Sequence, residues 1–320
     1  MSTVLPAWSV QILQVLTVLV CAPGISGFVA WLEARLQGRR GPRIVQPYLT
    51  LAKQFSKETL APHSVGPFFF VAPAAAFACY LVVPMLIPVL TSYPLPLGYM
   101  GDILGGGFIL ALGSFLVAVA AGSTGSSYAQ LGASRSKTFA AITEPVVLLV
   151  VFTVAIITTT DLPYVLGATI RSGPEQIVRP SHLLAAAALF MVILSETARI
   201  PVETHTGTIE LGMFEEARSF EHSGPLLAML TWGSATKQFV FYVLLCNVFV
   251  APWGLASTGA VKAVALAVAA IVAKACVVGI VVAVIDNSFA KLRLYKITEF
   301  VSAAFLLAVL AVVTLFLGGG

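Results

Sequence analysis

Eight apolar runs, each long enough to cross a bilayer as a helix, follow one another along almost the whole chain. About 20 apolar residues span the hydrocarbon core, and windows of that length lie at roughly 8–32, 66–91, 102–122, 139–160, 181–200, 226–251, 259–285 and 297–318. A soluble domain could not bury a chain of 320 residues that is 58% hydrophobic, with a mean hydropathy of +0.96. We therefore expect an all-α polytopic membrane protein with eight transmembrane helices, forming a single integral membrane domain over residues 1–320.

Lysine and arginine are distributed unevenly between the two sets of predicted loops. Thirteen lie in or, for Arg199, directly beside the loops at about 33–60, 123–138, 201–225 and 286–296, whereas three lie on the opposite side. Because loops rich in Lys and Arg stay in the cytoplasm, we expect these four loops to be cytoplasmic and both termini to lie on the outer, periplasmic side. The start of the chain lacks the basic region of a signal peptide, so we expect the first run to remain as a span. This topology accounts for the basic excess without nucleic acid as a partner.

Cysteine and histidine form no metal-ligand pattern in the sequence. The cysteines at 21, 79, 246 and 276 stand alone within predicted spans, and the four histidines are scattered. Iron–sulfur and zinc sites need paired or clustered ligands, so we expect no metal and no bound cofactor in this chain. The sequence also has no phosphate-binding glycine loop and no Ser/His/Asp arrangement, and we expect no catalytic residue.

The first cytoplasmic loop contains a predicted surface helix. Over residues 46–58, apolar positions recur at helical spacing while Lys53 and Lys57 lie on another side. This pattern is typical of a helix that lies along the membrane surface or against a partner. An ordinary basic interface helix has the same composition, so the pattern leaves both interpretations open.

Two glutamates lie inside predicted spans, near the cytoplasmic ends. Glu144 is about five residues, or roughly 7.5 Å at the α-helical rise, inside the fourth span, and Glu196 lies at a similar depth in the fifth. An ionisable group at membrane depth is costly and usually faces the protein interior, so both are candidates for moving protons. The alternative is a structural carboxylate paired with Arg135 or Arg199.

Two lysines also fall within predicted spans. Lys274 lies midway through the seventh span and meets the same criterion as the two glutamates. Lys237 is closer to an interface, where its long side chain could bring the ammonium group to water.

The segment from Glu196 to Gly224 holds six of the 14 acidic residues of the chain. Its first three are seven residues apart, which is close to two helical turns. The six are Glu196, Glu203, Glu210, Glu215, Glu216 and Glu221. A chain of acids leading from the cytoplasm into the bilayer and a solvated acidic face both fit this pattern.

Three ordered motifs connect the chain to a known family. They are RRGPRIVQPY at 39–48, LGASRSKTFAAITEP at 131–145, and the segment that begins at Glu196 and ends in EHSG at 221–224. Together they resemble the family that contains subunit 1 of respiratory complex I and the equivalent membrane subunit of formate hydrogenlyase, hydrogenase-4 and other membrane-bound [NiFe] hydrogenases. The long spacer in RIPVETHTGTIELGMFEEARSFEHSG is more similar to the hydrogenase branch, because complex I members have RAPFDLPEAESEL closely followed by EYSG.

The resemblance implies a non-catalytic subunit of an oxidoreductase complex in the cytoplasmic (inner) membrane of a bacterium or archaeon. Such a subunit anchors hydrogenase large and small subunits and iron–sulfur subunits, which carry the [NiFe] centre and the clusters. It links them to antiporter-like membrane subunits that translocate protons or sodium. With Lys274, the relay candidates are then Glu144, Glu196, Glu203, Glu210, Glu215 and Glu216, with Arg135 and Arg199 as charge partners. Docking of the soluble arm is expected at Arg35, Arg39, Arg40, Arg43, Lys53, Lys57 and Glu221.

Two other functions fit parts of the sequence. A quinone-site subunit of NADH:quinone oxidoreductase (complex I) would have the same fold, and quinone-dependent activity would distinguish it. A stand-alone secondary transporter usually has internal repeats and broken midplane helices, and the sequence shows no clear repeat.

Overall fold

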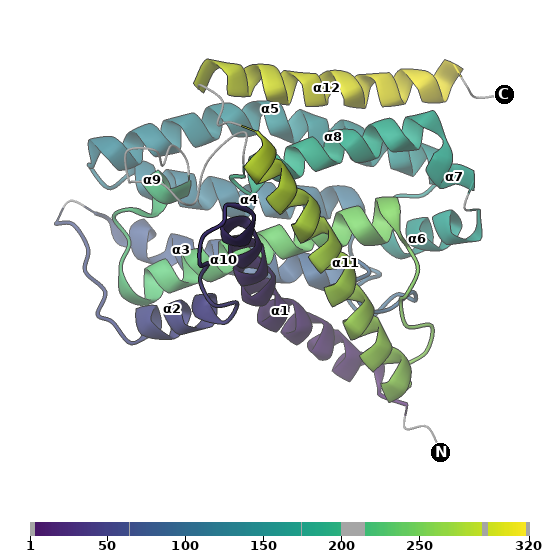
Figure 1. Cartoon of the computed structure of the whole chain (residues 1–320), viewed down its shortest axis with the longest axis horizontal. Coiled ribbons are helices and arrows are strands. Elements are labelled where there is room, and N and C mark those ends of the chain that lie inside the picture. Colours follow the sequence, from purple (N-terminus) through teal and green to yellow (C-terminus); the bar gives the residue numbers. More distant parts are fainter. Residues whose placement is uncertain (1–3, 64, 174, 200–214, 290–293, 318–320) are drawn as a thin grey trace.

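The computed structural model describes residues 4–63, 65–173, 175–199, 215–289 and 294–317. In this part of the chain the structure is helical, with two isolated β-bridges and no strand. The elements, drawn in Figure 1, are α1 (Ala7–Leu36), α2 (Gln46–Phe55), α3 (Pro67–Leu86), α4 (Ile103–Gly122), α5 (Ser127–Thr158), α6 (Pro163–Ser172), α7 (Glu175–Val178), α8 (Pro180–Glu196), α9 (Glu215–Ser219), α10 (Gly224–Leu244), the π-helix η2 (Leu245–Val250), α11 (Val261–Ser288) and α12 (Leu294–Leu317). The predicted all-α class is confirmed.

Seven of the described helices are long and apolar enough to cross a membrane, which makes the chain a multi-pass membrane protein. They are α1, α3, α4, α5, α10 with η2, α11 and α12. The remaining predicted span corresponds to α8, which is apolar but has only 17 residues. The sequence missed the short helices α6, α7 and α9, which lie between the long ones.

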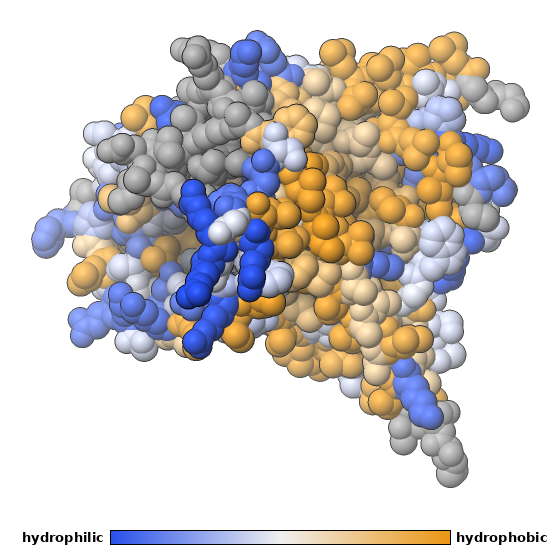
Figure 2. Space-filling model, viewed as in Figure 1, coloured by the Kyte–Doolittle hydropathy of each residue, from blue (hydrophilic) through white to orange (hydrophobic). Residues whose placement is uncertain are grey.

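Helix α10 occupies the centre of the bundle. It packs against α1, α2, α3, α8 and α11, while α12 packs on α5 and α8 at one side. Figure 1 shows α1 and α11 crossing the other long helices obliquely. In the most apolar window of α10, 78% of the residues are buried, against 22–44% for the other spans, so α10 is shielded and the others face lipid or further chains. Figure 2 shows hydrophobic side chains along α11 and hydrophilic ones over the loop after α1.

Two proline positions create carbonyl groups that side chains from other helices satisfy. Pro23 in α1 has no N–H for the carbonyl of Leu19, and Trp232 Nε1 of α10 donates to that oxygen at 3.0 Å. Pro84 lies in the last turn of α3, where carbonyls lack intrahelical partners, and Gln14 Nε2 of α1 donates to its carbonyl at 2.5 Å. Irregular backbone is tolerated at membrane depth where neighbouring helices satisfy it in this way.

The predicted loop at 123–138 is mostly helical, because α5 begins at Ser127 and continues for 32 residues. Close packing stabilises this extension: a Cβ at Gly132 would lie 2.5 Å from Cβ of Ala217 in α9. Only a glycine permits this approach. The helix predicted over 46–58 is confirmed as α2, and Tyr48 of α2 donates a hydrogen bond to the carbonyl of Val20 in α1.

Candidate ion-relay site

Glu196, the last residue of α8, forms a buried ion pair with Lys237 of α10. Its Oε2 lies 2.6 Å from Lys237 Nζ, and its Oε1 accepts a hydrogen bond from Thr143 Oγ1 of α5 at 2.7 Å. Lys237 Nζ donates a second bond to Ser114 Oγ of α4 at 2.8 Å. Residues of four helices, α4, α5, α8 and α10, therefore meet at this pair of charges. The pair is shielded from solvent, because the side chains of Lys237 and Glu196 keep only 7% and 21% of their surface exposed.

The sequence-based expectation that Lys237 reaches water is therefore wrong. The carboxylate of Glu196 compensates the loss of hydration that burial imposes on an ammonium group. The only sequence feature that pointed to Lys237 as an ion-pair partner was its charge within an apolar run. Ser114 and Thr143 carried no recognisable signal, because hydroxyl side chains are common in membrane helices.

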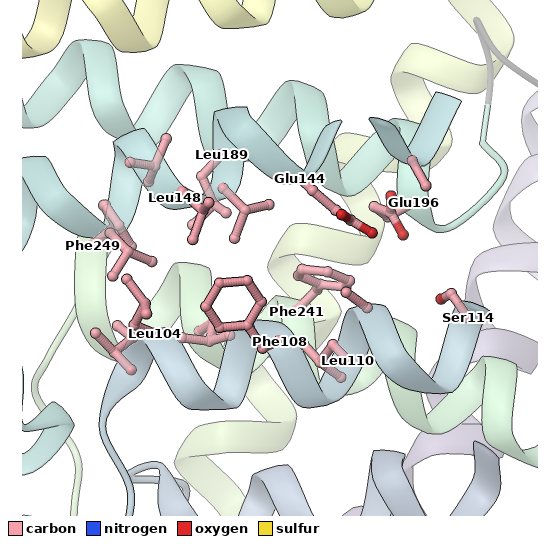
Figure 3. A pocket seen from close by; sticks show the side chains of 18 residues that line it. Leu104, Phe108, Leu110, Ser114, Glu144, Leu148, Leu189, Glu196, Phe241 and Phe249 are labelled. Carbon is pink, nitrogen blue, oxygen red and sulfur yellow. The ribbon is translucent and has the colours of Figure 1, made fainter. Parts of the chain in front are cut away.

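Glu144 follows Thr143 on α5 but has an exposed side chain. Figure 3 shows its carboxylate and that of Glu196 at the same end of a cavity of about 60 Å³, whose labelled lining is otherwise apolar apart from Ser114. The expectation that Glu144 faces the protein interior is wrong for this chain taken alone. A carboxylate at this position connects the buried pair to the outer surface of α4 and α5.

A second cavity of about 50 Å³ lies between Glu196 and helix α9, which precedes α10. Glu196 and Lys237 line it together with Glu215 and Arg218 of α9. Arg218 Nη2 lies 3.8 Å from Glu215 Oε1, and Arg218 Nη1 donates to Ser136 Oγ at 3.1 Å. This polar pocket brings Glu215, a sequence-predicted relay residue, to the buried pair.

The largest of the three cavities, about 440 Å³, lies between α1, α2, α3 and α10. Glu215, Glu216 and Arg218 line it as well, and so does Tyr80 of α3. Tyr80 Oη lies 3.3 Å from Ser114 Oγ, which is the hydroxyl that accepts from Lys237. Two polar routes, through α9 and through Tyr80, therefore lead from this cavity to the ion pair.

Arg199 has partners that the sequence did not predict. Its Nη1 lies 2.6 Å from Glu33 Oε1 of α1 and 3.5 Å from Asp286 Oδ2 of α11, and all three side chains are almost fully buried. The predicted pairing with Glu196 is wrong, because the chain turns at Ala198, which has a φ of 50°, and Arg199 then lies beyond the end of α8. The sequence feature that could have indicated Glu33 and Asp286 as partners of Arg199 is that each is an acidic residue at the end of a predicted span.

Arg135 is half-buried on α5, and no carboxylate of the described residues lies within 4.0 Å of its guanidinium group. It precedes Glu144 by nine residues, or two and a half turns, which places the two on opposite faces of the helix. The alternative pairing of Arg135 with Glu144 or Glu196 is therefore wrong. The half-buried Lys274 of α11 likewise has no carboxylate of the described chain within that distance; it bonds uncharged oxygens instead.

Two further relay candidates, Glu203 and Glu210, lie outside the described residues. The basic residues expected to dock a soluble arm have exposed side chains, and the carboxylate candidate Glu221 is half-buried. The basic set is Arg35, Arg39, Arg40, Arg43, Lys53 and Lys57. Arg35 lies over the Trp31 ring, 5.4 Å from its centroid.

The EHSG motif at 221–224 joins the segment before α10 to the segment before α3. Ser223 Oγ accepts a hydrogen bond from the N–H of Leu60 at 2.6 Å and donates one to its carbonyl at 2.8 Å. Gly224 has a φ of 55°, and a Cβ there would lie 2.6 Å from the carbonyl oxygen of Glu58. His222 stacks on Phe69 with ring centroids 4.2 Å apart, and burial lowers the pKa of its imidazole to about 4. The motif therefore joins residues 58–60 to the starts of α3 and α10.

Comparison with known proteins identifies the class to which this fold and site belong. The family model described as NADH dehydrogenase matches residues 10–317, so the chain belongs to that family, which includes subunit 1 of complex I. Formate hydrogenlyase subunit 4 of Escherichia coli (strain K12) is 29% identical over 95% of this chain and 97% of its own length. Hydrogenase-4 component C of the same organism is 28% identical over 93% and 92%. These matches confirm the resemblance seen in the motifs.

A solved structure shares the fold. It is described as the structure of the membrane-bound sulfane sulfur reductase, an archaeal respiratory membrane complex. One of its chains matches with a TM-score of 0.76 and 20% identity, over 95% of this chain and 99% of that chain. The arrangement of helices is therefore one that occurs in respiratory membrane complexes.

Proposed function

We propose that this chain is the membrane-anchoring and ion-coupling subunit of a membrane-bound [NiFe] hydrogenase or formate hydrogenlyase-type complex. The observation that carries the proposal is the buried Glu196–Lys237 pair, which lies between the carboxylates around the large cavity and the exposed Glu144. The similarity of the chain to formate hydrogenlyase subunit 4 and hydrogenase-4 component C over most of its length supports this choice of complex. The chain serves as a non-catalytic subunit of the oxidoreductase complex.

The proposed relay begins in the large cavity and ends at the exposed face of α5. Glu215 and Glu216 receive ions from the cytoplasmic side, Glu196 exchanges them beside Lys237, and Glu144 passes them on. Glu203 and Glu210, which lie outside the described residues, are kept as relay candidates because they precede α9 in the sequence. An exposed carboxylate at membrane depth is costly in lipid, so we assign the surface around Glu144 to contact with antiporter-like, proton- or sodium-translocating membrane subunits.

A topology with eight spans and both termini on the outer side fits the ion pairs. Glu33, Arg199 and Asp286 stand at the C-terminal ends of α1, α8 and α11, so these three helices end at one side of the bundle. Helices α1 and α11 run in the same direction only if α8 counts as a span. At about 1.5 Å per residue, its 17 residues reach roughly 25 Å, close to the 30 Å hydrocarbon core. We assign this side to the cytoplasm because its loops are basic, and we assign the complex to the inner membrane of a bacterium or archaeon.

The soluble arm is proposed to dock where the basic first loop and the EHSG segment meet. The reciprocal bonds of Ser223 with Leu60 hold these two segments together. The arm would contain the hydrogenase large and small subunits and iron–sulfur subunits, which hold the [NiFe] centre and the clusters. No cofactor is assigned to this chain.

The cavity of about 440 Å³ favours one alternative, a quinone-site subunit of NADH:quinone oxidoreductase. It is large enough for a cyclic head group, and both apolar and polar side chains line it. This alternative requires quinone-dependent activity of the complex.

One purification distinguishes the two functions. A tagged copy of the chain is extracted from native membranes in mild detergent, and the co-purifying proteins, the nickel content and the hydrogen activity are measured. Nickel with hydrogen turnover and no quinone requirement supports the hydrogenase assignment. Quinone-dependent oxidation of NADH without nickel supports the alternative, and isolation of the chain as an active monomeric transporter contradicts both.

A further inference from the structure

Lys274 of α11 lies against the point where α10 loses its regular helical form. The last turns of α10 continue as the π-helix η2, and the chain then leaves the helix at Ala251. Such an end leaves carbonyl groups without intrahelical N–H partners. Lys274 lies in the middle of α11, and at such a position within a span another part of the protein has to satisfy carbonyls of this kind.

Three oxygen atoms surround the Lys274 ammonium group. Nζ donates to Asn247 Oδ1 at 2.9 Å, to the carbonyl of Ala251 at 2.7 Å and to the carbonyl of Trp253 at 2.5 Å. A protonated amine has three N–H donors, whereas a neutral amine has two donors and a lone pair. Three acceptors at these distances match the three N–H donors of the protonated form.

The contacts of Asn247 extend this arrangement to α3. Its side chain is fully buried in η2, and Nδ2 donates to the carbonyls of Pro88 at 2.8 Å and Val89 at 3.2 Å. Those two residues belong to the buried irregular segment that follows α3. Lys274 thus joins α11, the broken end of α10 and the segment after α3 through one amide.

We infer that Asn247 Oδ1 and the carbonyls of Ala251 and Trp253 form a cradle for a small N–H-bearing cation, which Lys274 fills as a tethered ammonium ion. At this point α10 and α11 are held together by the ammonium cation, which is covalently attached to α11 through the Lys274 side chain. Lys274 consequently has no free lone pair with which to accept a proton. The relay proposed above does not include it.

Chemical rescue tests the cradle, independently of the proposed function. The full chain is purified in detergent micelles as wild type, Lys274→Ala, Lys274→Met and Lys262→Ala, and thermal midpoints are measured by tryptophan fluorescence. Lys262 is a matched control, because it is an exposed lysine in the first turn of the same helix. We expect both Lys274 variants to lose roughly 5–10 °C, and Lys262→Ala to match wild type.

Added cations then separate a cradle from ordinary packing. Methylammonium should restore at least half of the loss in Lys274→Ala, whereas tetramethylammonium, which has no N–H group, should restore none at the same ionic strength. The rescue should disappear in Lys274→Ala/Asn247→Leu, which lacks one cradle oxygen. A wild-type midpoint for Lys274→Met, or equal effects of the two cations, would overturn the inference.

Discussion

Replacing Glu196 with Gln separates the proton-carrying role of this residue from its role as a counter-charge. The substitution keeps the shape of the side chain but removes its titratable group and leaves the Lys237 ammonium without a carboxylate. Breaking a buried ion pair by removing one partner costs about 3–5 kcal/mol. Since Glu196 keeps 21% of its side chain exposed, we expect the lower end, about 3 kcal/mol. At roughly 2–4 °C per kcal/mol, the thermal midpoint of the chain should fall by about 6–12 °C.

A double variant removes this loss without restoring the relay. Glu196→Gln/Lys237→Met has no uncompensated charge, and replacing a buried pair by uncharged groups is often neutral or stabilising. We therefore expect its thermal midpoint to return close to that of the wild type. Ion translocation should be at least about tenfold slower than in the wild type in both variants, because loss of a positioned proton-transferring side chain typically slows a reaction 10²–10⁴-fold.

The assay uses the complex in sealed vesicles, with ion uptake measured per hydrogen turned over. Hydrogen chemistry with an artificial electron donor should be largely unchanged, which shows that the complex is assembled. Glu144→Gln should reduce uptake in the same way, and Glu216→Gln, near the entrance where water can substitute, should reduce it less. Wild-type uptake by the double variant would refute the relay and leave Glu196 as a structural carboxylate.

The remaining predictions concern the basic first loop and the EHSG segment. Reversing the charge of Arg39, Arg40 and Arg43 together should release the soluble arm into the soluble fraction while this chain stays in the membrane, and retention of the arm at physiological salt would contradict the docking assignment. Gly224→Ala should cost about 1–3 kcal/mol, because it combines a left-handed conformation with an overlap on Glu58, whereas Gly66→Ala, with no atom within 4 Å of the new Cβ, should match wild type in a melting experiment. The pKa of His222 is about 4 in the folded chain against 6.5 in the unfolded chain, so the unfolded state takes up the proton first and stability falls as the pH decreases from 6.5 toward 4. Lowering the pH from 7 to 5 should cost about 2 kcal/mol, and an undiminished pH dependence in His222→Phe would contradict this.

The pattern of apolar runs predicted the long helices well, because hydrocarbon thickness fixes both their length and their composition. It also located Glu196 at the end of α8, where the structure places it in the site. It could not identify Lys237 as the partner, since pairing depends on how helices rotate against one another and not on spacing within one helix. It also paired Arg199 incorrectly, because a single left-handed residue, Ala198, redirects the chain after α8.

The breaks in the helices were the least predictable feature. Prolines signal that a carbonyl will lose its partner, but not which distant side chain replaces it. Gln14 and Trp232, which satisfy such carbonyls in α3 and α1, are separated from them in sequence by 70 and 213 residues. Recognising them requires the packed bundle.

The Arg199 junction has a consequence for the order in which the protein is made. Glu33 is synthesised 166 residues before Arg199, which corresponds to roughly 8–33 s of translation at 5–20 residues per second. Asp286 is made later still, near the end of the chain. During that interval the C-terminal end of α1 holds the carboxylate of Glu33, and the arginine that pairs with it has not yet been synthesised. The junction is complete only after Asp286 near the end of α11 has been synthesised, so a chain truncated before α11 has Arg199 paired with Glu33 but lacks the second carboxylate.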